Sequence, residues 1–266
     1  MGAAGSRVVL VDVNEEGLAG TAELVDGASV HRVDVSDAAA MTALAAAVVA
    51  EHGGVHLLIN NAGITVEGAF REQSLADWQR VIGVNLWGVV HGLHAFMPHL
   101  EVADEAWIVN VSSVFGIVGI PSQSSYCATK FAVRGLSEAL WEELRGTHIG
   151  LSVVHPGGVN TNIVHAAKSY DAESSQASKD FFAKNTLSPT RAAATILRGV
   201  QRGQPRILVT KEAPMIDLIK RLMPVWGNRL IAYLTVQSLG LQALQARKLQ
   251  EFRSDRAARR GERATP

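Results

Sequence analysis

The stretch that decides the fold is residues 110–130, NVSSVFGIVGIPSQSSYCATK. It begins at the end of an apolar, strand-like run, residues 107–111, and two serines follow, the second of which is Ser113. A loop marked by glycine and proline leads into a segment with helical character. Tyr126 and Lys130 stand four residues apart on this predicted helix, so their side chains share one face and can converge.

This trio permits a specific chemistry. Ser113 follows a predicted strand, at the edge where open α/β sheets place their ligands. A free tyrosine has a pKa of about 10, and an ammonium group one helical turn away favours the phenolate. Lys130 is therefore predicted to lower the pKa of Tyr126 towards a useful range for proton transfer. The alternative is a chance meeting of three ordinary side chains, because Tyr-x-x-x-Lys alone is a common pattern.

Composition points to one compact enzyme-sized domain. The chain has 266 residues, of which 47% are hydrophobic and 19% charged, which suits a globular protein rather than a disordered one. It carries 25 Lys and Arg and 25 Asp and Glu, so net charge favours neither nucleic acid nor an anionic membrane. The single cysteine, Cys127, excludes an internal disulfide and fits a reducing, cytoplasmic location. We see no secretory segment and no apolar run of about 18 residues, which predicts a soluble protein.

Strand-like and helix-like segments alternate along the chain. Strands are predicted at 7–12, 29–35, 55–60, 105–111, 149–155 and 206–209. Helices are predicted at 14–25, 37–52, 74–99 (interrupted near Gly83 and ended by Pro98), 123–145 and 189–202. This alternation predicts an α/β fold with a doubly wound parallel sheet.

Six motifs occur in a fixed order. They are VLVD ending at Asp12, DV at 34–35, NNAG at 60–63, VN at 84–85, the NVSS…YCATK block and PGGVNT at 156–161. With these motifs the chain resembles the short-chain dehydrogenase/reductases over roughly residues 7–210. The resemblance implies a Rossmann-like oxidoreductase that moves a hydride between NAD(P) and an alcohol or ketone.

The resemblance assigns catalytic roles to four residues. Tyr126 is the expected proton donor or acceptor, and Ser113 orients the substrate oxygen. Lys130 assists Tyr126 and holds the nicotinamide ribose. Asn85 supports a water that relays protons. A kinked helix stabilised by the Asn85 side chain is an alternative explanation, and both can hold.

The remaining expected positions bind the cofactor. A carboxylate at Asp12 can accept both ribose hydroxyls of NAD and repels the 2′-phosphate of NADP, so NAD is the preferred cofactor. Asp34 and Val35 are expected at the adenine, and Asn60 is expected to be structural. Tyr126 and Lys130 also face the cofactor. The other expected cofactor-binding residues are Asn61, Ala62, Gly63, Pro156, Gly157, Val159 and Thr161.

One part of the family pattern is absent. Family members open with a strand, a TGxxxGxG turn and a helix, which need about thirty residues. Here the strand ending at Asp12 begins at Arg7, so the N-terminal βα unit and its anion-binding turn are missing. This predicts unpaired backbone between the strands that end at Asp12 and Asn60. The preferred explanation is a sequence without its true N-terminus, and the rival is a degenerate relative that no longer binds nucleotide.

The chain is expected to divide into a catalytic domain at 1–210, with a substrate lid at 162–187, an apolar helical extension at 211–252 and a disordered tail at 253–266. The extension is broken at Pro224 and Gly227. Packing on the protein itself or on a twin subunit ranks first for it, an apolar pocket cover second and a membrane-surface helix third.

The expected partners are a small-molecule alcohol or ketone, apolar and bulky, and further copies of the chain in a homodimer or homotetramer. No metal is expected from His91, His94 and His99, since only the first two share a helical face.

Two other functions remain open. One is a non-catalytic scaffold that keeps the site residues by descent, and the other is an enzyme completed by a partner chain.

Overall fold

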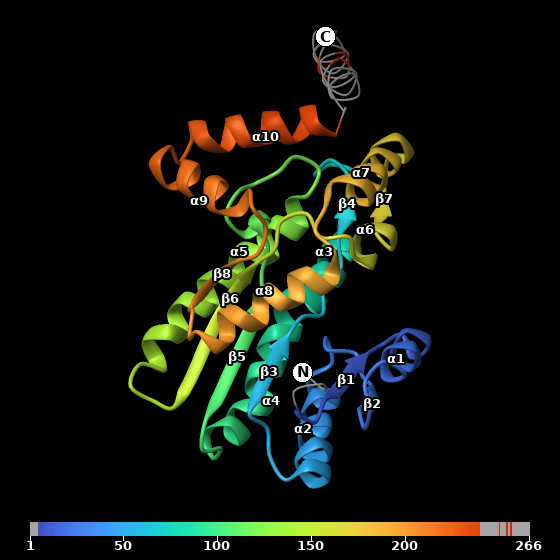
Figure 1. The fold of residues 1–266 in the computed structure, drawn as a ribbon. Coiled ribbons are helices and arrows are strands. Elements are labelled where there is room, and N and C mark those ends of the chain that lie inside the picture. Colours follow the sequence, from blue (N-terminus) through green and yellow to red (C-terminus); the bar gives the residue numbers. More distant parts are fainter. Residues whose placement is uncertain (1–4, 240–249, 251–253, 255, 257–266) are drawn as a thin grey trace, which may run out of the picture.

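The computed structural model describes residues 5–239, 250, 254 and 256, and its ribbon is an α/β fold with helices around parallel strands (Figure 1). The strands are β1 (Val9–Asp12), β2 (Ser29–Arg32), β3 (Leu57–Asn60), β4 (Val66–Glu67), β5 (Ala106–Val111), β6 (Ile149–His155), β7 (Lys168–Ser169) and β8 (Arg206–Leu208). The longer helices are α1 (Glu15–Ala22), α2 (Ala38–His52), α3 (Leu75–Ile82), α4 (Gly88–Glu101), α5 (Ser124–Glu143), α7 (Ala172–Asn185), α8 (Pro189–Gln201), α9 (Ala213–Leu222) and α10 (Trp226–Ser238). Three short helices complete the fold: the π-helical turn η2 (Gly83–Trp87), the 3₁₀ turn η3 (Val114–Gly116) and α6 (Asn162–His165).

The main sheet is parallel, with the order β3-β5-β6-β8. Helices α4 and α5 pack on one of its faces, through Leu93 and Val133 against Ile108. Helix α8 covers the other face, where Ala192 packs against Val154. Alternating strands and helices therefore form the doubly wound arrangement that the sequence predicts.

The sheet is interrupted beside β3. Strands β1 and β2 pair with each other, and Asp12 lies opposite Arg32, but in the described chain β1 does not pair with β3. Figure 1 shows β1, β2 and α1 apart from the main sheet. Helix α2 bridges the interruption, because Met41 and Leu44 belong to an apolar cluster that takes in residues from both β1 and β3. The interruption falls where the sequence predicts a missing strand.

Several predicted boundaries are wrong in detail. Strand β2 ends at Arg32 rather than at residue 35. Pro98 does not end its helix, because α4 continues to Glu101. Proline is tolerated in this last turn since the carbonyl that loses its partner belongs to the exposed His94. Gly227 is not a break either, for it lies inside α10 and a side chain there would meet the Ile219 backbone.

One stretch among the described residues, Leu75–Glu101, is long and apolar enough to cross a membrane by composition. It consists of α3, η2 and α4, so the prediction that no such run exists is wrong. Its residues Val81, Val89, Leu93 and Phe96 are buried in the protein. One face of the stretch therefore packs in the core, and 39% of its most apolar window is buried.

Candidate active site

Ser113 and Tyr126 meet at the carboxyl end of β5. Ser113 caps η3, and its hydroxyl oxygen accepts a hydrogen bond from the Phe115 amide at 3.1 Å. Tyr126 lies in the first turn of α5, half-buried, with its ring edge-on to Phe115. The Ser113 hydroxyl is close enough to hydrogen-bond the phenol. The structure therefore brings together the serine and the tyrosine that the sequence separates by thirteen residues.

Lys130 lies one turn further along α5 and is buried. Its Nζ donates to the Val111 carbonyl at 2.9 Å and lies 5.5 Å from the centre of the Tyr126 ring. Burial lowers the pKa of Lys130 to about 8, and no carboxylate is among the causes of this shift. The helical spacing thus places the ammonium beside the phenol as predicted.

The predicted effect of Lys130 on Tyr126 is not observed. Burial raises the pKa of Tyr126 to about 12, and the hydrogen bond from Ser113 opposes this only in part. Lys130 is not among the causes of the shift. With a pKa of about 8, Lys130 loses its charge before Tyr126 loses its proton, so it provides no ammonium to oppose the desolvation of the phenolate. In this state Tyr126 holds its proton firmly.

Asn85 is buried within η2, where the α-helical hydrogen-bond pattern is interrupted. Its amide oxygen accepts from the Ile64 amide at 2.8 Å, and its nitrogen donates to the Ile64 carbonyl at 2.9 Å and to the Thr129 hydroxyl at 3.1 Å. The side chain therefore joins the segment after β3 to α5. This is the structural explanation for an asparagine in a helix, and the π-helical turn accompanies it.

The expected adenosine-binding residues lie at the carboxyl ends of β1 and β2. Asp12 is exposed, and its carboxylate accepts one hydrogen bond, from the Asn14 amide at 2.9 Å. Asp34 is exposed and accepts from the amide and hydroxyl of Ser36. Val35 belongs to the apolar cluster around α2. Exposed carboxylates with free acceptor capacity fit the hydroxyl donors of a ribose.

The expected nicotinamide-binding residues follow β6. Pro156 and Gly157 are partly exposed, Val159 is buried, and Thr161 is exposed with no capping bond to α6. A side chain at Gly157 would meet the side-chain oxygens of Thr210 and Glu212, which would have to move to make room for it. Asn61 and Ala62, after β3, are exposed and Gly63 is partly exposed. Asn60 donates to Asn110 at 2.9 Å, which confirms its predicted structural role.

Both ends of a dinucleotide thus have suitable residues in this chain. The adenosine end has carboxylates, and the nicotinamide end has Thr161, Tyr126 and Lys130. Among the described residues, no glycine-rich turn between a strand and a helix lies between these ends to hold a pyrophosphate. The fit to a nicotinamide dinucleotide is therefore good at the two ends and incomplete in the middle.

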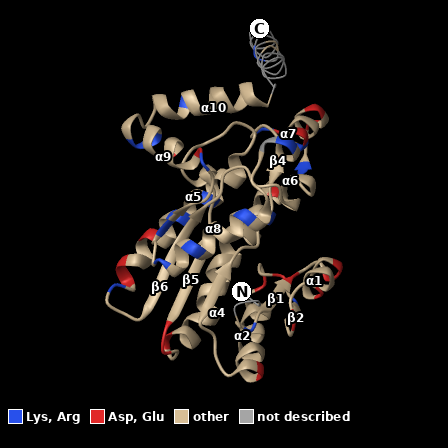
Figure 2. Ribbon diagram, viewed as in Figure 1, with Lys and Arg blue, Asp and Glu red and all other residues tan. Residues whose placement is uncertain are grey.

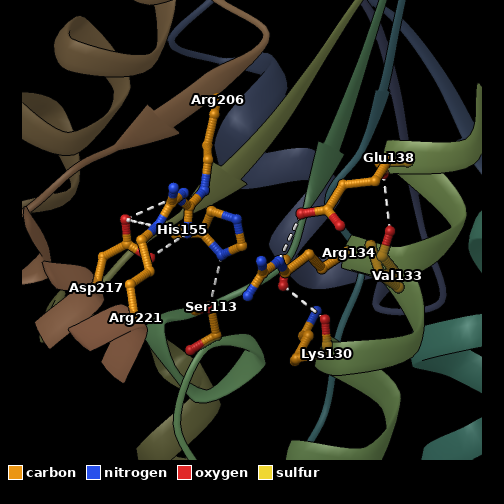
Figure 3. Close-up of polar contacts among 11 residues, drawn as sticks. Ser113, Lys130, Val133, Arg134, Glu138, His155, Arg206, Asp217 and Arg221 are labelled. Carbon is orange, nitrogen blue, oxygen red and sulfur yellow. Dashed lines mark hydrogen bonds and ion pairs between the residues drawn. The ribbon is translucent and has the colours of Figure 1, made fainter. Parts of the chain in front are cut away.

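A buried polar network lies behind Ser113 (Figure 3). His155, the last residue of β6, lies with Nδ1 2.9 Å from the main-chain oxygen of Ser113. Arg206 and Asp217 pair through two contacts of 2.7 Å, and Arg221 reaches the same carboxylate. Burial lowers the pKa of His155 to about 4, so the imidazole is neutral at pH 7. His155 was not predicted from the sequence, although a histidine that ends an apolar strand before Pro156 was a usable signal.

A second set of contacts holds the segment expected to be the lid. Lys168 donates to both oxygens of Asp77 at 2.9 and 3.0 Å, and the Tyr170 hydroxyl donates to the same carboxylate at 2.5 Å. The hydrogen bond from Lys168 holds the pKa of Asp77 well below its usual range. Nearby, the buried Glu67 accepts from Ser174 at 2.5 Å. Strands β4 and β7 pair beside these contacts. Neither the strand pair nor these side-chain contacts were predicted from the sequence.

No metal site is found among the described residues, because no three His, Cys, Asp or Glu side chains gather closely enough to hold an ion. His91 instead contacts the Val35 carbonyl at 2.9 Å through Nδ1 and stacks on Trp87.

Comparison with known proteins agrees with this geometry. The short chain dehydrogenase family model matches residues 1–172. The oxidoreductase SadH of Mycobacterium tuberculosis is 42% identical over 235 residues, which covers 85% of each chain. A 3-alpha-(or 20-beta)-hydroxysteroid dehydrogenase of Mycobacterium bovis is 41% identical over 162 residues, 60% of this chain and 62% of that protein.

Solved structures show the same fold. A short-chain dehydrogenase/reductase from Burkholderia phymatum in complex with NAD superposes with a TM-score of 0.77 and 32% identity, covering 83% of this chain and 86% of that one. A short-chain dehydrogenase from Streptomyces avermitilis gives a TM-score of 0.73 and 27% identity over 88% and 89% of the two chains. The chain therefore belongs to the short-chain dehydrogenase/reductase family and is an oxidoreductase of that type.

Proposed function

We propose that this protein transfers a hydride between NAD(H) and the carbonyl or alcohol carbon of an apolar substrate, with Tyr126 as the acid or base. The observation that carries the proposal is the convergence of Ser113, Tyr126 and Lys130 at the carboxyl end of β5. That the protein is an oxidoreductase of this family rests on the family model over residues 1–172 and on relatives that cover most of the chain.

Each side chain has a distinct task in the reduction of a ketone. The phenol of Tyr126 donates its proton to the developing alkoxide, and the Ser113 hydroxyl donates a hydrogen bond to the same oxygen. Lys130 supplies a positive charge beside the phenolate that forms. Bound NADH supplies the hydride. Proton loss from Tyr126 needs replacement, for which Asn85 and the Ile64 backbone are the proposed relay support.

NAD is the proposed cofactor because Asp12 offers a carboxylate to the ribose hydroxyls. One feature opposes this preference. Arg32 lies opposite Asp12 in the β1–β2 register and donates to the Val13 carbonyl at 3.3 Å. An arginine at this edge is able to bind the 2′-phosphate of NADP. It is paired with Glu15 at 3.4 Å, however, which reduces its attraction for a phosphate.

The proposed substrate is a bulky, apolar secondary alcohol or ketone. Apolar residues surround the loop after Ser113, where Phe115 and Val118 contact Ile216 and Ile231 from α9 and α10. A relative with 41% identity over 162 residues is named for hydroxysteroids. A panel of a hydroxysteroid, cyclohexanol and glycerol tests this proposal, and a preference for glycerol would contradict it.

The decisive experiment is a fluorescence titration of the folded chain with NADH and, in parallel, with NADPH. Binding of NADH at micromolar concentration, clearly tighter than NADPH, supports a working nucleotide site with Asp12 as the selector. Turnover of the steroid with NAD then supports the reaction itself.

A non-catalytic scaffold is the second candidate, and the interruption between β1 and β3 favours it. Absence of NADH binding to a folded sample would support this candidate. A variant extended by about thirty residues, forming a strand, a glycine-rich turn and a helix before Arg7, then separates two cases. Gain of NADH binding restores the enzyme proposal, whereas continued absence of binding supports the scaffold.

A further inference from the structure

Helices α9 and α10 each carry two apolar faces. The inner faces are covered: Ile216 and Ile219 of α9 and Ile231 of α10 pack on the loop that follows Ser113. The outer faces are exposed, and their large apolar residues are Met215, Leu218 and Leu222 on α9, Met223 and Val225 between the helices, and Trp226, Leu230, Tyr233 and Leu234 on α10.

These exposed residues form two stripes rather than a scatter. Positions 215, 218 and 222 recur at the spacing of one helical face, and so do 226, 230 and 233. Leu222 is 72% exposed and Trp226 is 68% exposed. Two adjoining apolar stripes of this kind mark an interaction surface. We call the outer residues of 215–234 the α9–α10 face.

Charge is unevenly distributed between this region and the remainder of the chain. Residues 206–266 contain twelve Lys and Arg against five Asp and Glu, whereas residues 1–205 contain thirteen against twenty. Figure 2 shows basic positions on α9 and α10, with acidic positions on α1 and near the ends of α2 and α5. The chain is thus neutral overall, but its C-terminal region has a net positive charge and the remainder has a net negative charge.

The carboxylates near the α9–α10 face are already engaged. Asp217 is held by Arg206 and Arg221, and Glu212 accepts from the Gly158 amide at 3.3 Å. Two cations remain without an opposing carboxylate among the ion pairs of the described residues. Lys220 donates to the Pro224 carbonyl and to Asn228, and Arg229 lies over the Trp226 ring at 4.7 Å.

We propose that the α9–α10 face docks on the surface of a bilayer that contains anionic lipids. Leucines and methionines would enter the boundary of the acyl chains, Trp226 and Tyr233 would lie at the level of the headgroups, and Arg229 would contact lipid phosphates. A symmetric contact between two copies is disfavoured, because it would bring two patches of the same uncompensated positive charge together. Membrane contact ranks third among the expectations from the sequence, because a sequence does not show which helix faces are covered.

Two hydrogen bonds connect α10 to the loop beside the candidate active site. Asn228 of α10 accepts from the Gly119 amide at 3.0 Å and donates to the Gly119 carbonyl at 3.1 Å. Gly119 belongs to the loop that runs from Ser113 to α5. Docking would thus bring the loop between Ser113 and α5 close to the membrane. The proposal of lipid binding does not depend on the proposed catalytic function.

The test is co-sedimentation of the full chain with vesicles. One set contains phosphatidylcholine alone, and the other contains phosphatidylcholine with about 30% phosphatidylglycerol, an anionic lipid. The expected result is strong pelleting with the anionic vesicles, weak pelleting with the neutral ones, and loss of binding as salt rises. A wild-type chain that stays in the supernatant with both sets overturns the proposal.

Matched variants locate the surface. Leu222→Asp should lower the partition onto anionic vesicles by about tenfold or more, since it places a charge in the apolar stripe. Leu24→Asp is the control, because Leu24 is 84% exposed on the opposite, acidic part of the chain. Leu230→Asp serves as a second variant if Leu222→Asp does not fold. Equal losses for the α9–α10 variants and the control would overturn the proposal.

A second pair of variants tests the electrostatic contribution to membrane binding. Arg229→Gln should reduce binding to anionic vesicles by about fivefold, and leave binding to neutral vesicles unchanged. Arg145→Gln, an exposed arginine after α5, should change neither. Sedimentation velocity without lipid tests the alternative that a second copy of the chain occupies this face. A dimer that Leu222→Asp converts to a monomer would show that this face joins two copies, and would overturn the membrane proposal.

Discussion

The imidazole Nδ1 of His155 lies 2.9 Å from the main-chain oxygen of Ser113. Because the buried ring is neutral at pH 7, Nδ1 carries the proton and donates to that oxygen, which holds the serine backbone at the end of β5. We expect His155 to act as a positioning residue for Ser113, because its contact is with the main chain of the serine.

Replacement of this histidine should separate positioning from binding. His155→Leu should lower kcat by about tenfold or more while leaving NADH affinity within about twofold, since a misplaced Ser113 weakens only the contact with the substrate oxygen. His148→Leu is the control, because His148 also contacts a backbone carbonyl, that of Leu100, but away from the site. Equal kcat values for the two variants would refute the role.

The same histidine predicts a dependence of stability on pH. Its folded pKa of about 4 lies below the unfolded value of 6.5, so the unfolded chain binds the extra proton between these values. Stability should therefore fall as pH decreases from about 6.5 to 4, by up to about 3 kcal/mol from this group. Urea unfolding at several pH values should show a shallower fall for His155→Leu.

Tyr126→Phe should nearly abolish turnover. Removal of the proton donor is expected to lower kcat by about 10²–10⁴-fold, while NADH affinity changes little because the ring remains. Tyr233→Phe, on an exposed part of α10, should retain full activity in the same steady-state assay. Retention of activity in Tyr126→Phe would sink the assignment.

Lys130→Met should stabilise the protein at neutral pH. The folded pKa of about 8 lies below the ordinary 10.5, so wild-type stability rises with pH between these values as the buried amine loses its proton. The gain from the methionine should be larger at pH 7 than at pH 10 by about 2 kcal/mol. Lys211→Met, at an exposed site, should show no such difference in chemical unfolding.

Asp12→Ser should change cofactor choice. Loss of the carboxylate removes two acceptors for the ribose and the repulsion of a 2′-phosphate, and Arg32 remains nearby to attract it. NADH affinity should fall by about tenfold and NADPH affinity should rise. Glu16→Ser, an exposed acid on α1, is the control in the same titrations. An unchanged ratio would show that Asp12 does not select the cofactor.

Asp77→Asn should loosen the segment between β7 and α7. The variant loses the ion pair with Lys168, which is expected to lower stability, to raise KM and to speed proteolysis within residues 162–187. The folded pKa of Asp77 is depressed, so its contribution is present above about pH 4 and is lost as pH falls below that. Asp180→Asn, whose amide oxygen can still accept the surface hydrogen bond from Gln176, should behave like wild type.

The sequence predicted those features that depend on local pattern. The spacing of Tyr126 and Lys130 fixed their common helix face, and the alternation of strands and helices fixed the sheet. Asn14 and Asp37 cap α1 and α2 where the pattern placed the helix starts.

Features that depend on burial or on distant residues were not predictable. The raised pKa of Tyr126 follows from desolvation, which a sequence does not show. Asp77 and Lys168 are 91 positions apart, and nothing in either segment indicates the other. Arg32 became relevant only when the β1–β2 register placed it opposite Asp12.

The interruption beside β3 has a consequence for cooperativity. Strands β1 and β2 with α1 depend on α2 and its packing against α4 for their attachment to the main sheet, so the chain should unfold as two units of unequal stability. A dinucleotide that contacts Asp12 at one end and Lys130 at the other would span both units. Its binding would act as a non-covalent cross-link between the two units. Affinity for the ligand and the cooperativity of unfolding would then be thermodynamically linked, so a tighter ligand would make the two units unfold together.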